Sequence, residues 1–425
     1  MSETFQAPRG TRDILPPESD RWRALVAAFA DHARLAGYGQ VIPPMFEELA
    51  VFSRVGESTD VVRKEMFVLQ ARDGEAHQAL RPEQTASVCR AFAQHRPQVP
   101  WKAWYAGPNF RYEKPQKGRY RQFDQVGLEV LGPDDPDVDV EVIALAWRFY
   151  ERVGLRRVRL LVNSLGDGDG RARYVDALRA HFGAHVDALS AASRETLGQN
   201  PLRVLDSKRP EDAALVAAAP RMADYLSTED ADHFARVRSG LDALGIPYEV
   251  EPRLVRGLDY YTRTTFEFAA EALDAAQNAV GGGGRYDGLV ADLGGPSVPG
   301  VGFALGVDRI LLACDAEGAF PAPPGGVDAF VVCTTTGTDA IVLCDELRRA
   351  GIAVDRAFDG RSMKSQMKAA DRSGAIVALL VGEREAADGV VTLRPMGGGE
   401  QRSVARADVV AEVAAALRQA SAADL

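Results

Sequence analysis

Apolar and polar residues alternate between Arg121 and Leu131, which predicts a β-strand with two unlike faces. One face carries Val126, Leu128 and Val130, and these apolar side chains are predicted to lie in the core. The opposite face carries Phe123, Gln125, Gly127 and Glu129. An aromatic ring, an amide, a gap and a carboxylate along one face predict the floor of a polar pocket. The alternative is a half-exposed antiparallel strand whose polar side chains are solvated.

A basic loop precedes this strand. We expect a first strand over Phe110 to Glu113 and a turn over Lys114 to Gly118, because proline and glycine break regular structure there. The basic residues of this stretch are Arg111, Lys114, Lys117, Arg119 and Arg121. Only two acidic residues accompany them up to Gln125, whereas the whole chain has a net charge of −10. The positive charge is therefore a local feature.

The arginines of this loop suit the recognition of phosphate. A guanidinium group offers a fixed fork of donors that can bind phosphate oxygens bidentately. The chain contains neither G-x-x-x-x-G-K-[ST] nor G-x-G-x-x-G, the backbone phosphate-binding motifs. If the protein binds a nucleotide, side chains must hold its phosphates. Phe123, near Arg111 and Arg119, would then be a platform for adenine.

Two further stretches carry small residues at regular positions. Four consecutive glycines, 281–284, allow a backbone to approach a ligand closely, although a flexible turn is the alternative. In the predicted strand Gly300 to Gly306, small residues alternate with apolar ones, which leaves room for a flat ligand on one face. A helix is predicted to follow, with Arg309 in its first turn.

A carboxylate and a hydroxyl stand together where a predicted strand meets a predicted helix, in the sequence RPEQT at 81–85. Glu83 and Thr85 could accept hydrogen bonds from an ammonium group. They could equally cap the helix that follows. The residues alone leave both interpretations open.

The periodicity also predicts the domain organisation. The segment from about 167 to 245 is rich in alanine and patterned as helix, so we expect a helical insertion. After a linker rich in proline and glycine at 319–326, strand and helix patterns alternate to the end. We therefore expect a first domain over residues 1–325, which includes the insertion, and a compact α/β domain over residues 326–425.

Composition narrows the class of protein. Of the 425 residues, 46% are hydrophobic and 26% charged, which is typical of a soluble globular protein. The four cysteines form no C-x-x-C pair, so we expect a reducing, cytoplasmic location and neither a disulfide framework nor a zinc ribbon. No apolar run is long enough for a membrane span, and the first residues lack the apolar region of a secretory signal. An acidic chain would contact RNA only through local patches.

Several of these stretches resemble one known family. The sequence FRYEKPQKGRYRQF, followed by QVGLEVLG, resembles motif 2 of class II aminoacyl-tRNA synthetases, and in detail that of the histidyl-tRNA synthetases. GYGQVIPPMFEELAVF resembles motif 1, which builds the dimer interface in the family, and GVGFALGVDRILL resembles motif 3. VRGLDYYTRTTFEF resembles the histidine-specific signature. One departure is Gln84, where the family commonly has glycine.

The resemblance implies an α+β fold. It would comprise an antiparallel-sheet class II synthetase catalytic core with a helical insertion, and a C-terminal α/β anticodon-binding domain. It implies a cytoplasmic homodimer that joins L-histidine to tRNA(His) with ATP, through a histidyl-adenylate. Seven basic residues face three acidic ones between Arg348 and Arg372, which fits an anticodon contact or an ordinary solvated helix face.

The resemblance also implies residue roles. Arg111 and Arg256 would be the catalytic pair, at the α-phosphate and the histidine carboxylate. Arg119 and Arg309 would hold the outer phosphates with Mg²⁺. The remaining ATP-binding residues would be Phe123, which stacks on adenine, and Glu113, which accepts from its amino group. No side chain is an obvious general base.

For histidine, the resemblance places Glu129 and Tyr261 at the imidazole. The remaining histidine-binding residues would be Glu83, Gln84, Thr85, Gln125 and Tyr260, together with Arg111 and Arg256. Gln116 and Lys117 would meet the acceptor end of the tRNA.

Two other functions compete with this interpretation. A catalytically silent relative serves as a regulatory subunit of ATP phosphoribosyltransferase, but it has degraded motifs and lacks the anticodon-binding domain. This chain keeps Arg111, Arg256 and Arg309 and the C-terminal α/β pattern. A class II synthetase for another amino acid is the second alternative, and Glu129 together with RGLDYY argues against it.

Overall fold

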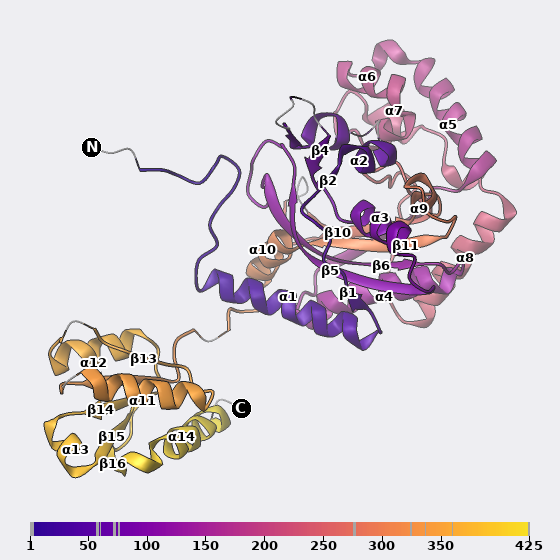
Figure 1. Ribbon diagram of the computed structural model, residues 1–425. Helices are drawn as coiled ribbons and strands as arrows, with labels where there is room; N and C mark the ends of the chain where they lie inside the picture. Colours follow the sequence, from indigo (N-terminus) through magenta and orange to yellow (C-terminus); the bar gives the residue numbers. More distant parts are fainter. Residues whose placement is uncertain are drawn as a thin grey trace. The chain divides into compact units, whose positions relative to one another are not determined.

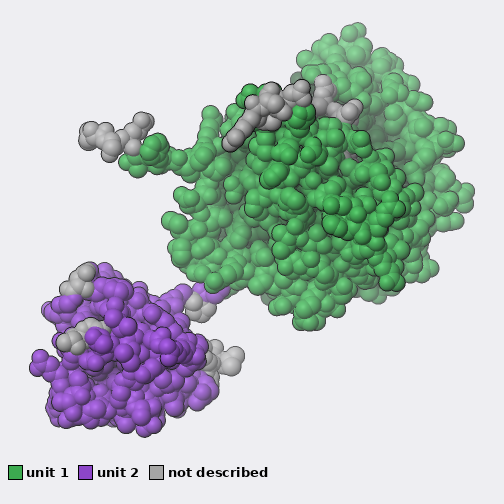
Figure 2. Space-filling view, in the orientation of Figure 1, with its two compact units in different colours: residues 1–321 green, residues 322–425 purple. Residues whose placement is uncertain are grey.

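The chain forms two compact units, residues 1–321 and 322–425, which Figure 2 colours separately. The computed structural model describes residues 4–423 apart from 57–58, 60, 71–73, 75–76, 275–277, 324, 336 and 359. Within these residues, no helix combines the length and the apolar character that crossing a membrane requires.

An eight-stranded sheet forms the centre of the first unit, with the order β1-β5-β6-β11-β10-β9-β7-β8 (Figure 1). Its six inner strands are β5 (Trp101–Phe110), β6 (Gln122–Leu131), β11 (Gly300–Gly306), β10 (Ala279–Arg285), β9 (Thr262–Ala270) and β7 (Val158–Ser164). All of these pair antiparallel, and only the short edge strands β1 (Gly39–Gln40) and β8 (Glu249–Val250) join in parallel. The expected antiparallel core is confirmed.

The alternation of β6 is confirmed, but the strand predicted before it is wrong. Val126, Leu128 and Val130 are all buried in the main core. The preceding strand ends at Phe110, which pairs with Gln122, and does not begin there. Beyond this pair the backbone amide of Tyr112 donates to the carbonyl of Glu65 at 2.6 Å, outside the sheet. Residues 111–121 therefore form the connecting loop.

Helices cover the apolar face of this sheet. The covering helices are α1 (Glu18–Leu35), α4 (Pro136–Arg152) and α10 (Val307–Glu317). Phe29 of α1 is fully buried and meets Phe149 of α4 edge-on, with ring centroids 5.1 Å apart. The same core contains Phe303 and Leu305 of β11, so the predicted apolar face of that strand is confirmed. Its opposite face is left for the small residues.

A second core supports the polar face of the sheet. It joins α2 (Leu49–Gly56), α3 (Thr85–His95) and α9 (Leu289–Asp292) through apolar residues such as Phe52 and Phe92. Nearby lie the π-helix η1 (Val61–Glu65) and a three-stranded sheet of β2 (Phe46–Glu48), β4 (Gln78–Leu80) and β3 (Val68–Leu69). These elements carry Glu83, Gln84 and Thr85 to the sheet.

All the regular elements between β7 and β8 are helices. It contains α5 (Gly168–Gly183), η2 (Val186–Ala188), α6 (Ala191–Gln199), η3 (Pro201–Asp206), α7 (Ala213–Ala217), η4 (Met222–Asp224) and α8 (Thr228–Ala243). It has a core of its own, which includes the fully buried Leu178 and Phe182. Figure 1 shows α5, α6 and α7 grouped together, while α8 returns towards the sheet. We call residues 168–243 the insertion.

The second unit is an α/β domain around a five-stranded sheet of order β13-β12-β14-β15-β16. Its strands are β13 (Val354–Arg356), β12 (Ala329–Cys333), β14 (Val377–Val381), β15 (Val390–Pro395) and β16 (Arg402–Ala405). The first three are parallel and the last two antiparallel. Its helices are α11 (Gly337–Arg349), α12 (Met363–Arg372), α13 (Glu383–Asp388), η5 (Arg406–Asp408) and α14 (Val409–Ala423).

Candidate active site

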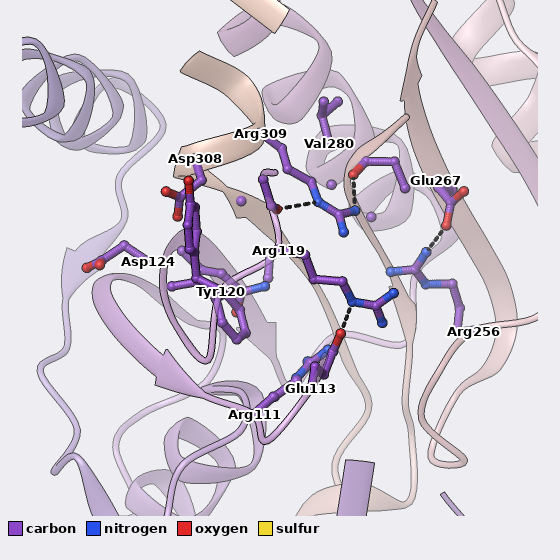
Figure 3. A pocket seen from close by; sticks show the side chains of 18 residues that line it. Arg111, Glu113, Arg119, Tyr120, Asp124, Arg256, Glu267, Val280, Asp308 and Arg309 are labelled. Carbon is purple, nitrogen blue, oxygen red and sulfur yellow. Dashed lines mark hydrogen bonds and ion pairs between the residues drawn. The ribbon is translucent and has the colours of Figure 1, made fainter. Parts of the chain in front are cut away.

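A pocket of about 270 Å³ opens on the polar face of the large sheet. The loop 111–121, the strand β10 and the first turn of α10 form its walls. The four arginines singled out by the sequence, Arg111, Arg119, Arg256 and Arg309, all line it. Figure 3 shows Arg119, Arg256 and Arg309 entering this space from three different parts of the fold. Residues far apart in the sequence therefore share one cavity.

Each arginine is held in place by the protein. Arg309 donates to the carbonyl oxygens of Ala279 at 2.7 Å and Gly118 at 3.2 Å. Arg256 forms an ion pair with Glu267 at 2.7 Å, and Arg119 forms one with Glu113. Carbonyl partners orient a guanidinium without neutralising it. Arg309 therefore keeps its full charge for a ligand.

The pocket concentrates like charges. Burial lowers the pKa of Arg309, and the neighbouring Arg119 and Arg111 lower it further. Burial also lowers the pKa of Arg111, although Glu65 opposes this change. A cluster of cations that depress one another's pKa is stabilised by an anionic ligand.

The glycine-rich stretch forms strand β10, so the alternative of a flexible turn is wrong. A Cβ atom at position 282 would lie 2.7 Å from Nη1 of Arg256 and would displace its guanidinium. On the adjacent strand, Ala304 and Gly306 line the pocket. The small residues therefore create the space that the arginines occupy.

Glu129 lies deeper than the arginines and is fully buried. Its carboxylate accepts hydrogen bonds from the hydroxyls of Thr85 at 2.7 Å, Tyr105 at 3.1 Å and Tyr286. Burial raises the pKa of Glu129 to about 8, although these hydroxyls oppose the rise. Its carboxylate packs against Gly302, where a side chain would collide with it. Glu129 is not among the residues that line the open pocket.

Two tyrosines lie near both Glu129 and Arg256. The rings of Tyr260 and Tyr261 are 4.6 Å apart, and Tyr260 meets Tyr286 edge-on at 5.7 Å. Burial raises the pKa of Tyr261, while the positive charge of Arg256 lowers it. The phenol of Tyr261 is therefore close to a guanidinium of the open pocket and within the electrostatic influence of Glu129.

Glu83 caps helix α3, which was one of its two predicted roles. Its carboxylate accepts from the backbone amides of Thr85 at 2.6 Å and Ala86 at 2.9 Å. Gln84 donates to the carbonyl of Gly107 at 3.3 Å, while its buried Oε1 has no partner among the described residues. Polar groups are thus present here, but Glu83 and Thr85 are engaged within the protein.

The remaining predicted residues lie around the pocket mouth. Phe123 lies beneath Arg111, whose guanidinium carbon is 5.3 Å from the ring centroid. Gln125 accepts from Asn109 at 2.8 Å and lines the pocket. Gln116 and Lys117 are exposed at the tip of the loop, where Gln116 and Arg119 exchange backbone hydrogen bonds.

Sequence reasoning missed several residues of this site, among them Glu267, Tyr105 and Tyr286. Glu267 pairs with Arg256, and its signal was a single charged residue between two phenylalanines in β9. Tyr105 and Tyr286 come from β5 and from the turn after β10, and both donate to Glu129. Nothing local distinguishes these tyrosines from ordinary core residues.

Within the described part of the chain, no group of three or more His, Cys, Asp or Glu side chains could hold a metal ion. Four acidic residues line the pocket wall: Glu113, Asp124, Glu267 and Asp308. Burial raises the pKa of one of them, Asp124, to about 6, and the neighbouring Asp308 adds to the rise.

Comparisons with known proteins agree over nearly the whole chain. The family Histidyl-tRNA synthetase matches residues 10–310, and the family Anticodon binding domain matches residues 328–416. A histidine--tRNA ligase of Rhodococcus erythropolis is 49% identical over 417 residues, which are 96% of this chain and 97% of the relative. One of Geobacillus kaustophilus is 45% identical over 408 residues, covering 94% and 96%.

The fold gives the same result. The crystal structure of apo S. aureus histidyl-tRNA synthetase matches with a TM-score of 0.82 and 35% identity, over 96% of this chain and all of that one. Sequence families, relatives and a solved structure thus point to the same family. The chain belongs to the histidyl-tRNA synthetase family.

Proposed function

We propose that this protein ligates L-histidine to tRNA(His) with ATP, through a histidyl-adenylate. The observation that carries this proposal is the convergence of Arg111, Arg119, Arg256 and Arg309 on one pocket next to the buried Glu129. Four fixed cations suit a triphosphate and a carboxylate, and a buried carboxylate suits a polar ring.

In the first step an oxygen of the histidine carboxylate bonds to the α-phosphorus of ATP, and the bond from that phosphorus to pyrophosphate breaks. Two anions approach each other and negative charge builds on the phosphoryl oxygens. Fixed positive donors lower this barrier because they require no reorganisation during the reaction. We assign Arg111 and Arg256 to the α-phosphate and the carboxylate, and Arg119 and Arg309 to the outer phosphates.

In the second step a hydroxyl of the terminal ribose of the tRNA attacks the histidyl carbonyl carbon, and the bond to AMP breaks. The hydroxyl loses its proton to a phosphate oxygen of the adenylate, since we assign no side chain as general base. The arginines then stabilise the departing AMP as they stabilised the departing pyrophosphate.

Mg²⁺ fits this pocket as a companion of ATP. The ion is usually bound by substrate phosphates and one or two carboxylates, not by an all-protein cage. Glu267, a carboxylate on the pocket wall, would hold it. When bound, the ion neutralises charge on the phosphates.

Adenine would stack on Phe123, and the carboxylate of Glu113 would accept from its amino group. Phe123 already lies against one guanidinium, so its ring has the geometry for a stacked cationic or aromatic neighbour.

We assign recognition of the imidazole to Glu129 and Tyr261. A neutral imidazole donates at one nitrogen and accepts at the other, and a carboxyl group with a phenol can meet both needs. A site that hydrogen-bonds a polar ring rejects apolar analogues because its buried groups would stay unpaired. The amino end of histidine would lie near Gln84, Gln125 and Tyr260, with Glu83 and Thr85 shaping the wall behind them.

We further propose that Gln116 and Lys117, exposed on the loop, contact the acceptor end of the tRNA. The second unit would bind the anticodon, since it belongs to a family described as an anticodon binding domain. We also propose a cytoplasmic homodimer built through the motif 1 segment, where Ile42 and Phe46 are exposed.

ATP–pyrophosphate exchange with a panel of amino acids tests the proposal. Histidine alone should support exchange. Exchange with another amino acid would indicate a different class II synthetase. No exchange from a folded protein that binds ATP phosphoribosyltransferase would indicate the regulatory alternative.

A further inference from the structure

The insertion forms hydrogen bonds with one loop of the candidate active site. The loop 256–261 carries Arg256, Tyr260 and Tyr261, yet it has no regular secondary structure of its own. Its outer side faces α5 and η3 of the insertion through a set of polar contacts. Its inner side packs on the second core through Leu258 and Tyr260.

Arginine side chains of the insertion bind backbone carbonyl groups of this loop. Arg203 of η3 donates to the carbonyl of Gly257 at 2.6 Å. Arg171 of α5 donates to the carbonyls of Asp259 at 3.4 Å and Tyr261. The carbonyl groups of residues 257, 259 and 261 are therefore held by two guanidinium groups of the insertion.

Asp259 completes the attachment. Its carboxylate accepts from Nδ2 of Asn200 at 3.0 Å and pairs with Arg203 at 3.3 Å. Arg171 is half-buried, and this burial lowers its pKa. A half-buried cation whose donors satisfy carbonyl groups orients those groups more strictly than an exposed ion pair would. We call Arg171, Asn200 and Arg203 the clamp.

We propose that the clamp positions the histidine side of the active site, so that the insertion sets the affinity for the amino acid. This inference rests on the proposed function of the site. The clamp touches neither substrate, and its members are positioning residues. The loop supplies Arg256 and Tyr261, whereas Arg309 and Phe123 come from elements that the clamp does not contact. Loss of the clamp should therefore affect histidine more than ATP.

The variant Arg203→Ala tests the proposal, with Arg203→Lys as the conservative variant and Arg179→Ala as the control. Arg179 lies on α5, more than half exposed, and pairs only with Asp176 of the same helix among the described residues. In ATP–pyrophosphate exchange, Arg203→Ala should raise the KM for histidine about tenfold, which corresponds to one charged hydrogen bond. The KM for ATP should change less than about twofold, because Arg111, Arg119 and Arg309 keep their supports. Arg203→Lys should recover most of the affinity, and Arg179→Ala should match the wild type.

Hydrogen exchange of the backbone amides provides a readout that needs no activity. The amides of residues 256–261 should exchange faster in Arg203→Ala than in Arg179→Ala, because the loop would open locally. Equal effects on both substrates, or unchanged exchange in this loop, would overturn the proposal. If the wild-type enzyme did not use histidine, the proposed function would be wrong. The hydrogen-exchange measurement would still test whether the clamp holds the loop. If Arg203→Ala lowers the melting temperature, Asn200→Ala can be measured in its place, because it removes a single hydrogen bond to Asp259.

Discussion

The two halves of the candidate active site differ in how their polar groups are engaged. The open half, lined by Arg111, Arg119 and Arg309, is accessible and cationic, and Arg309 is oriented by carbonyl groups alone. In the closed half, Glu129 is fully buried and bonded to Thr85 and to two tyrosines. The open half carries positive charge that can bind an anion, whereas the polar groups around Glu129 in the closed half already bond to one another.

This difference indicates how the two substrates would bind. A phosphate entering the open half meets donors that are already aimed, so its binding requires little rearrangement. An imidazole entering the closed half must replace at least one internal hydrogen bond of Glu129. That exchange is favourable only for a ligand that restores the lost bond, so the closed half discriminates more strictly. Arg256 belongs to both halves, since it lines the open pocket and lies beside Tyr261.

Removal of Arg256 should impair both halves of the site, because both halves depend on it. We expect Arg256→Ala to lower kcat for histidine-dependent exchange about 10³-fold, the upper range for loss of one preorganised donor. Arg159→Ala is the matched control: Arg159 also pairs with a glutamate on the same sheet, but on its exposed edge. Circular dichroism and thermal melting would verify that both variants fold. An active Arg256→Ala enzyme would contradict the role that we assign.

Substitution of Glu129 should affect the closed half alone and so separate the two halves. Glu129→Gln keeps the shape but places an amide among three hydroxyl donors. We expect the KM for histidine to rise about 10- to 100-fold, as when a buried polar group is left without its partner, with little change in the KM for ATP. Glu151→Gln, on the surface of α4, is the control. A parallel loss of ATP affinity would show that the two halves are not separable.

The part of this site that could be predicted from sequence was the open half. The faces of β6 and β11 follow from local alternation, which directly placed Gln125 and Ala304. Of the closed half, the same alternation placed Glu129 on the polar face of β6. The strand before the loop was placed wrongly because its end depends on the register with β6, and no local pattern shows a register.

The closed half could not be derived in the same way. Tyr105 and Tyr286 reach Glu129 from strands far apart in sequence, and each resembles a core tyrosine until the sheet is assembled. The sequence around Glu83 permitted two roles. The cap geometry, which only coordinates reveal, shows where its carboxylate is engaged.

The closed half should also respond to pH. Glu129 has a pKa of about 8 in the folded protein, above the ordinary value of 4.5, so the folded state binds more protons than the unfolded state. Its contribution to stability is therefore fully present below about pH 4.5 and is lost as the pH rises through about 8. The free energy of unfolding should fall by at most about 1.4 kcal/mol per pH unit in this window.

Urea denaturation at several pH values would test this expectation, with Glu129→Gln as the comparison. The variant lacks the titrating group, so the difference between the two proteins should shrink or change sign as the pH rises. Parallel curves across the window would mean that Glu129 does not titrate there.

The smallest expected effect concerns the open half alone and its aromatic floor. Phe123→Leu removes a stacking surface while keeping an apolar side chain, so we expect the KM for ATP to rise about fivefold, the value of roughly 1 kcal/mol of stacking. The KM for histidine should stay constant, because Phe123 lies away from Glu129 and the clamp. Tyr112→Leu is the matched control, since Tyr112 is an exposed aromatic of the loop that precedes β6, stacks with Arg121 at 3.7 Å and does not line the pocket. If both variants raised the KM for ATP equally, the effect would not be specific to the Phe123 ring. If Phe123→Leu raised the KM for histidine instead, the division of the site into two halves would be wrong at this position.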